Sequence, residues 1–243
     1  MSRKFRLAAV AATLGLTLAA CGGGGGSATE DTNGADGGST PVNQVELSFA
    51  PISAGKLTVC SDAPYEPFEG IWLAPAAGTC DLVASSITIT EERSQNALFS
   101  DPYFDADQSL LVRSDDASTY TDLASLAGKT IAVQTGTTGE SYAKENAGDA
   151  TVQSFEDAAA MFAALEGKQV DAVLQDLPIN AFRAVKQGTT QVTATFPTDE
   201  KYGFAIAKDN VDLQNAVNES LAEFRATGVY DEIYTKYFGT PGK

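Results

Sequence analysis

The stretch CDLVASSITITEERSQNALFSDPYFDADQSLL, residues 80–111, contains the clearest pattern in the chain. Three apolar residues at 82–84 predict a short buried strand, which is followed by serine and threonine hydroxyls. Arg93 then falls in the first turn of a helix that Thr90 can cap. A guanidinium at that place offers a rigid fork of donors to a carboxylate, and a solvated arginine on a surface helix is the alternative.

Outside this stretch, predicted strands and helices alternate along the chain. We expect strands over residues 57–60, 82–84, 109–112, 130–133 and 170–174. We expect helical segments after Thr90 and over residues 71–77, 121–127, 140–146, 155–166, 213–226 and 230–237. Ser154 and Asp157 form a capping box for the helix at 155–166. This alternation predicts an α/β fold with mostly parallel sheets.

Residues 1–44 carry the pattern of an export signal and a tether. Residues 1–20 place basic side chains before a short apolar run, which indicates a signal peptide. The sequence LAA before Cys21 resembles the lipobox of bacterial lipoproteins, so we expect cleavage before Cys21 and lipid attachment to it. An ordinary signal peptide followed by a chance cysteine is the alternative. Residues 21–44 are rich in glycine and polar side chains, which predicts a flexible linker.

The composition excludes several kinds of function. Removing the three basic residues of the signal from 16 Lys and Arg leaves 13 against 32 Asp and Glu, a formal charge of −19. This charge repels phosphate backbones and anionic lipid head groups, so we expect no nucleic-acid partner and membrane association only through the lipid. The chain has no histidine, which removes Ser-His triads, histidine bases and histidine metal ligands. We expect no catalytic residue, no metal and no cofactor.

Cys60 and Cys80 remain when Cys21 carries the lipid, and an exported chain favours a disulfide between them. If residues 57–60 and 81–84 are neighbouring parallel strands, Cys60 lies near the end of one and Cys80 before the start of the other. That offset could exceed the limit of ~7 Å between Cα atoms, whereas a local bend could close it. The sequence does not decide whether Cys60 and Cys80 form a disulfide.

Six motifs follow one another along the chain: TITEER at 88–93, FSDPYF at 99–104, VQTGTTG at 133–139, VLQDLP at 173–178, KYGFAIAK at 201–208 and GVYDEIYTKYFG at 228–239. In this order they resemble the polar amino-acid solute-binding proteins of ABC importers, the extracellular solute-binding protein family 3. The resemblance runs from about residue 55 to the C-terminus.

This resemblance implies a two-lobed, type II periplasmic-binding-protein-like fold that closes around its ligand. Lobe 1 would comprise residues 45–104 and 203–243, and lobe 2 residues 105–202, with two chain crossings near 103–107 and 199–202. Between the first two strands lie only residues 61–80, where relatives carry a further helix and an edge strand. The resemblance therefore implies a first lobe that lacks one helix and one edge strand through an internal deletion.

The resemblance also implies the two charged ends of a ligand site. Arg93 matches the residue that holds the ligand α-carboxylate, assisted by Thr88 and by the backbone N–H of Thr138 at the start of a helix. Asp176 matches the position that pairs with the α-ammonium, and Ser86 assists it through its hydroxyl or carbonyl.

The side-chain end of the implied site is less sharply defined. Asp62 and Tyr65 match positions that touch the ligand side chain, and Gln134 and Gln175 complete a polar pocket. A strand-end cap for Asp62 and a core aromatic for Tyr65 are the structural alternatives. An acidic pocket suits a cationic side chain such as that of arginine or lysine, whereas two glutamines suit a neutral polar one.

The leading hypothesis is therefore a lipid-anchored receptor on the extracytoplasmic side of the cell membrane. It would capture a polar or basic amino acid and deliver it to the membrane subunits of an ABC permease. Two alternatives stay open. One is an enzyme on the same fold, similar to cyclohexadienyl or prephenate dehydratases, and the other is a truncated relic that no longer binds.

Overall fold

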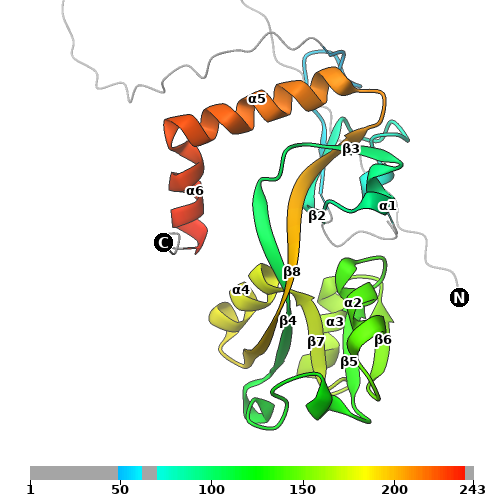
Figure 1. Ribbon diagram of the computed structural model, residues 1–243, viewed down its shortest axis with the longest axis vertical. Helices are drawn as coiled ribbons and strands as arrows, with labels where there is room; N and C mark the ends of the chain where they lie inside the picture. The colour runs from blue at the N-terminus through cyan, green and yellow to red at the C-terminus, as the bar shows by residue number, and fades with distance from the viewer. Residues whose placement is uncertain (1–48, 62–69, 239–243) are drawn as a thin grey trace, which may run out of the picture. The chain divides into compact units, whose positions relative to one another are not determined.

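The computed structural model describes residues 49–61 and 70–238, all within one compact unit, residues 45–243 (Figure 1). The expected signal peptide, Cys21 and linker lie outside the described residues. None of the helices in the described ranges is long and apolar enough to cross a membrane.

The strands are β1 (Val59–Cys60), β2 (Leu82–Thr88), β3 (Ala97–Phe99), β4 (Phe104–Arg113), β5 (Thr130–Gln134), β6 (Thr151–Phe155), β7 (Ala172–Asp176) and β8 (Thr190–Ala207). The α-helices are α1 (Glu91–Ser94), α2 (Thr138–Asn146), α3 (Ala158–Glu166), α4 (Leu177–Gln187), α5 (Val211–Thr227) and α6 (Val229–Phe238). Short 3-10 helices cover Ile71–Leu73, Ser114–Asp116 and Ala124–Leu126.

The described strands form one mixed sheet in the order β1-β2-β8-β4-β7-β5-β6, with β3 also paired to β8. The pairs β1–β2, β5–β6 and β5–β7 are parallel, whereas β2–β8, β3–β8, β4–β7 and β4–β8 are antiparallel. The α/β class is as expected, but the expectation of mostly parallel sheets is wrong. The reason is β8, which runs antiparallel along three other strands and whose sequence, interrupted by Pro197, did not predict a long strand.

Strands β4 and β8 run side by side from end to end of β4 (Figure 1). Phe104 at the start of β4 lies opposite Tyr202, and Arg113 at its end lies opposite Thr190. The segments expected to be chain crossings thus lie opposite each other in these two strands. Beyond Tyr202, β8 continues and pairs with β2, so the same strand reaches both parts of the sheet.

The apolar core explains why β4 contains the uninterrupted run LLV. Successive side chains of a strand point to opposite faces of the sheet. Leu110 packs with Ala143 of α2 on one face, and Leu111 packs with Met161 of α3 on the other. Both leucines are fully buried, which stabilises the fold by roughly 2 kcal/mol for each side chain.

The predicted capping box at Ser154 is wrong in its details. Ser154 lies in β6, which pairs in parallel with β5, and helix α3 begins at Ala158 rather than at residue 155. Asp157 is the N-cap, and its Oδ1 accepts a hydrogen bond from the N–H of Ala160 at 2.7 Å. Strand pairing with β5 overrides the local helical pattern of residues 154–157.

The structure joins Cys60 and Cys80 by a disulfide, with 5.8 Å between their Cα atoms. A bend before β2 produces this approach, because the N–H of Asp81 donates to the carbonyl of Thr58 at 2.8 Å. The buried Asp81 carboxylate also accepts the N–H of Thr58 at 2.7 Å, which fixes the two segments together. A disulfide closing a loop of this length stabilises a fold by about 3 kcal/mol.

Candidate functional site

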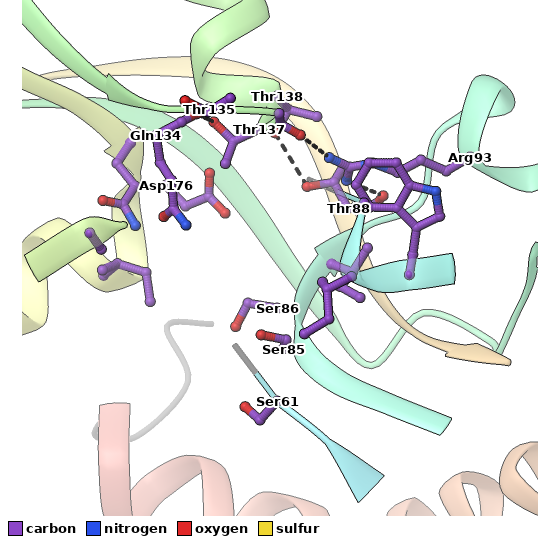
Figure 2. A pocket seen from close by; sticks show the side chains of 18 of the residues that line it. Ser61, Ser85, Ser86, Thr88, Arg93, Gln134, Thr135, Thr137, Thr138 and Asp176 are labelled. Atoms are coloured by element: carbon purple, nitrogen blue, oxygen red, sulfur yellow. Dashed lines mark hydrogen bonds between the residues drawn. The ribbon is translucent and has the colours of Figure 1, made fainter. Parts of the chain in front are cut away.

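A cleft of about 460 Å³ is lined by residues from β2, α1, the loop after β5, the start of α2 and the end of β7. Figure 2 shows Thr88, Thr138 and Arg93 gathered at one end of this cleft, with Asp176 and Gln134 at the other. Among the described lining residues, Arg93 is the single basic side chain and Asp176 the single acidic one. The cleft therefore presents one positive and one negative group to a ligand.

The position of Arg93 follows from the end of β2 and the cap of α1. The Thr90 hydroxyl accepts the N–H of Arg93 at 3.1 Å, as the sequence predicts for an N-cap. The guanidinium then turns back toward the sheet, where Nη1 donates to the Thr88 carbonyl at 2.9 Å and Nη2 to the Gly136 carbonyl at 3.1 Å. The ring of Trp72 covers it, with 4.5 Å between the guanidinium carbon and the ring centroid.

Hydrogen bonds to the described residues account for only part of the donors of the Arg93 guanidinium. A guanidinium carries five N–H donors, and the two carbonyls use two of them. Burial lowers the pKa of Arg93 from its ordinary value, against the opposing effect of the Glu200 and Asp176 carboxylates. A bound carboxylate would favour the charged guanidinium in the same way as these side chains do.

The loop after β5 is held by a capping box at the start of α2. The Thr137 hydroxyl accepts the N–H of Glu140 at 3.1 Å, and the Glu140 carboxylate accepts the N–H of Gly136 at 2.8 Å. Ser154 donates to the other Glu140 oxygen at 2.5 Å. Thr138 therefore begins α2 inside the cleft, where the first-turn N–H groups of a helix lack intrahelical partners and favour an anion.

Asp176 lies at the end of β7, where its carboxylate has two protein donors. Gln108 Nε2 donates to Oδ1 at 2.6 Å, and the Tyr202 hydroxyl donates to Oδ2. Burial raises the pKa of Asp176 to about 6, and the nearby Glu200 charge acts in the same direction. The hydrogen bonds from Tyr202 and Gln108 and the charge of Arg93 oppose that rise. A ligand cation beside Asp176 would favour the ionised carboxylate.

The sequence and the fold of this chain both match known proteins. Residues 56–240 match the sequence model of the bacterial extracellular solute-binding proteins, family 3. The chain belongs to this family. It is 38% identical over 160 residues to the ABC transporter glutamine-binding protein GlnH of Bacillus subtilis (strain 168), which covers 66% of this chain and 58% of that relative.

Two solved structures are similar to this family 3 protein. One is the P235GK mutant of ArgBP from T. maritima, with 34% identity and a TM-score of 0.66 over 71% of this chain and 75% of that chain. The other is the ancestral amino acid-binding protein AncCDT-1, described as a precursor of cyclohexadienyl dehydratase. It is 36% identical, with a TM-score of 0.66 over 71% of this chain and 75% of that chain. The expected type II periplasmic-binding-protein-like fold is thereby confirmed.

The structure of this family 3 protein brings together every expected ligand-binding residue that it describes. These residues line the one cleft: Ser86, Thr88, Arg93, Gln134, Thr138, Gln175 and Asp176. Asp62 and Tyr65, expected at the side-chain end of the site, lie outside the described residues.

Ser86 has an unusual backbone conformation within the cleft. Its φ of 51° is in the left-handed region, and the pairing of β2 with β8 shifts register between Val83 and Ile87. Burial raises the pKa of the Tyr103 phenol, and Ser86, which lies close to this phenol, has a smaller effect that favours its ionised form. Non-glycine residues in this region cost free energy and gather at functional sites.

Sequence reasoning missed three residues behind the cleft in this family 3 protein. Gln108 is fully buried and donates to both Asp176 and Glu200, while Tyr202 donates to Asp176. The signal for Gln108 was a lone amide shortly before the apolar run LLV in β4. Glu200 and Tyr202 adjoin or belong to the KYGFAIAK motif, which served only to support the resemblance.

Proposed function

We propose that this protein is a lipid-anchored receptor that captures a polar amino acid outside the membrane and delivers it to an ABC importer. The observation that carries this proposal is the pair of opposite charges, Arg93 and Asp176, which line the same cleft. A free amino acid carries the complementary pair of charges on its carboxylate and ammonium groups.

Each end of the ligand has a partner in this proposal. The remaining N–H donors of Arg93 and the backbone N–H of Thr138 hold the carboxylate, because charged donors and helix starts favour anions. Asp176 holds the ammonium, and the Ser86 carbonyl or hydroxyl supplements it. Gln134 and Gln175 contact the ligand side chain, together with Asp62 and Tyr65.

The two halves of the site belong to different lobes in this proposal. Arg93 and Thr88 belong to lobe 1, residues 45–104 and 203–243, whereas Gly136 and Thr138 belong to lobe 2, residues 105–202. The hydrogen bond from Arg93 to the Gly136 carbonyl supports this arrangement, since it joins the two segments at the cleft. A ligand that contacts both lobes stabilises their closed arrangement by its differential contacts.

The ligand in this proposal is a neutral polar or a cationic amino acid. The relatives point to glutamine and arginine, because GlnH is a glutamine-binding protein and ArgBP carries an arginine-binding name. Acidic amino acids are disfavoured, since Arg93 is the single basic side chain among the described lining residues and the ligand carboxylate uses it. Mass spectrometry of the molecule released when the purified protein is denatured tests this choice. Release of an acidic amino acid, or of a solute without an ammonium group, would contradict it.

The proposal includes the lipid on Cys21 and excludes turnover of the ligand. Fractionation of cells that express wild type or Cys21→Ser tests the anchor, because the substituted protein should leave the membrane fraction. AncCDT-1 is described as a precursor of a dehydratase, so conversion of prephenate by the purified protein is the matching enzymatic assay. We expect no conversion, and measurable turnover would favour the enzyme instead.

A further inference from the structure

Glu200 lies behind the cleft and accepts hydrogen bonds from four side chains. Its Oε2 accepts the hydroxyls of Thr88 and Thr138, each at 2.7 Å. Its Oε1 accepts Gln108 Nε2 at 2.9 Å and the Thr198 hydroxyl at 3.0 Å. Glu200 lines a neighbouring hollow with Asp105 and Asp107 rather than the cleft itself, so it reaches the threonines from the opposite side.

Donor counting fixes the direction of the threonine hydroxyls. A carboxylate only accepts hydrogen bonds, and a threonine hydroxyl has a single hydrogen to donate. Thr88 and Thr138 both line the cleft, yet both hydrogens are directed to Glu200 behind it. Toward a ligand these two oxygens therefore offer lone pairs and no hydrogen.

We propose that Glu200 is a positioning residue, whose two threonine hydrogen bonds leave the Thr88 and Thr138 hydroxyl oxygens as acceptors for an ammonium group rather than as donors to a carboxylate. The inference rests on the proposed amino-acid ligand and changes one part of it. Thr88 was expected to assist the carboxylate, but its hydroxyl hydrogen is already used. The carboxylate is left to Arg93 and to backbone N–H groups.

Gln108 connects this arrangement to Asp176. Its Nε2 donates to Asp176 at 2.6 Å and to Glu200 at 2.9 Å, so one buried amide holds both carboxylates in place. The Thr88 carbonyl also accepts Arg93 Nη1 at 2.9 Å. Glu200 thus stabilises one continuous set of hydrogen bonds that runs from Asp176 to Arg93, the residue proposed to hold the ligand carboxylate.

The binding test compares amino acids with analogues that lack only the ammonium group. L-arginine is paired with 5-guanidinopentanoate, and L-glutamine with glutaramate, by calorimetry on wild type, Glu200→Ala and the isosteric Glu200→Gln. The ratio of the analogue Kd to the amino-acid Kd measures the preference for ammonium. This ratio should fall about tenfold or more in Glu200→Ala, because the freed hydroxyls lose an ammonium contact and can donate to a carboxylate. The fall should be smaller in Glu200→Gln, whose amide oxygen still accepts hydrogen bonds.

Asp199→Asn is the matched control, because it removes the same charge from the adjacent exposed residue, and asparagine tolerates the φ of 53° found there. Its ratio should equal that of wild type. A ratio in Glu200→Ala within twofold of wild type would overturn the proposal, as would an equal fall in Asp199→Asn.

A second measurement needs no ligand and separates this inference from the proposed function. Hydroxyl protons held by a carboxylate exchange slowly, so the Thr88 and Thr138 hydroxyl protons should give NMR signals in the ligand-free wild-type protein that disappear in Glu200→Ala. If wild type binds no amino acid, the proposed function fails, and these signals still decide the direction of the hydroxyls. Their absence from wild type would overturn the inference even if amino acids bind.

Discussion

Replacing Asp176 by asparagine should make the ligand-free protein more stable at neutral pH while weakening amino-acid binding. Burial raises the pKa of Asp176 from 3.8 to about 6. The folded state therefore holds the proton more tightly than the unfolded chain does, and ionisation of Asp176 above pH 6 destabilises the fold. The difference between these two pKa values corresponds to about 3 kcal/mol at neutral pH.

Urea denaturation of wild type and Asp176→Asn at several pH values tests whether the substitution raises or lowers the free energy of unfolding. At pH 7 the variant should have a free energy of unfolding higher by up to about 3 kcal/mol, and this difference should shrink as the pH falls from 6 to 4. The comparison between the two proteins isolates Asp176 from the other carboxylates. Asparagine keeps the shape of the side chain and one acceptor for Gln108 or Tyr202.

A variant that is less stable than wild type at pH 7, with a difference that does not change with pH, would refute this reasoning. It would mean that the ionised carboxylate is stabilised by its two hydrogen bonds more than it is destabilised by burial. The same samples should show amino-acid binding weakened by roughly a hundredfold or more, since the ligand ammonium loses its buried partner.

Three other perturbations test separate parts of the account. Arg93→Ala should weaken amino-acid binding by roughly a hundredfold or more in calorimetry, whereas an unchanged Kd would remove Arg93 from the site. The double variant Cys60→Ser, Cys80→Ser should lower the free energy of unfolding by about 3 kcal/mol in urea, and an unchanged midpoint would show that the disulfide contributes nothing. Gly139→Ala would place a Cβ 2.9 Å from Gln108 Oε1, next to the bridge between the two carboxylates. Binding should therefore weaken, and wild-type affinity would contradict the role of Gln108.

Local signals in the sequence were sufficient for the parts of the site formed by nearby residues. The Thr90 cap and the place of Arg93 after β2 depend on residues within a few positions of each other, so capping rules predict them. Asp176 was placed by its motif at the end of a strand, and the structure puts it in the same cleft as Arg93. Capping chemistry therefore predicted the place of Arg93, whereas the role of Asp176 came from the resemblance to the family.

The residues that local patterns missed depend on distant partners. Glu200 contacts Thr88 and Thr138, which are 112 and 62 positions away in the chain. No periodicity in β8 predicts such contacts, because they arise from its antiparallel pairing with β2 and β4. The sequence did not decide whether the disulfide forms, because the bend at Asp81 depends on hydrogen bonds to Thr58, a distant residue in the chain.

The most direct test of the central claim is calorimetric titration of the purified protein with each of the common L-amino acids. We expect saturable, one-to-one binding of a neutral polar or cationic amino acid, with L-glutamine and L-arginine as the first candidates. We also expect the analogue without the ammonium group to bind far more weakly. The absence of binding by every amino acid in the series would contradict the account, as would equally tight binding of the amino acid and its ammonium-free analogue.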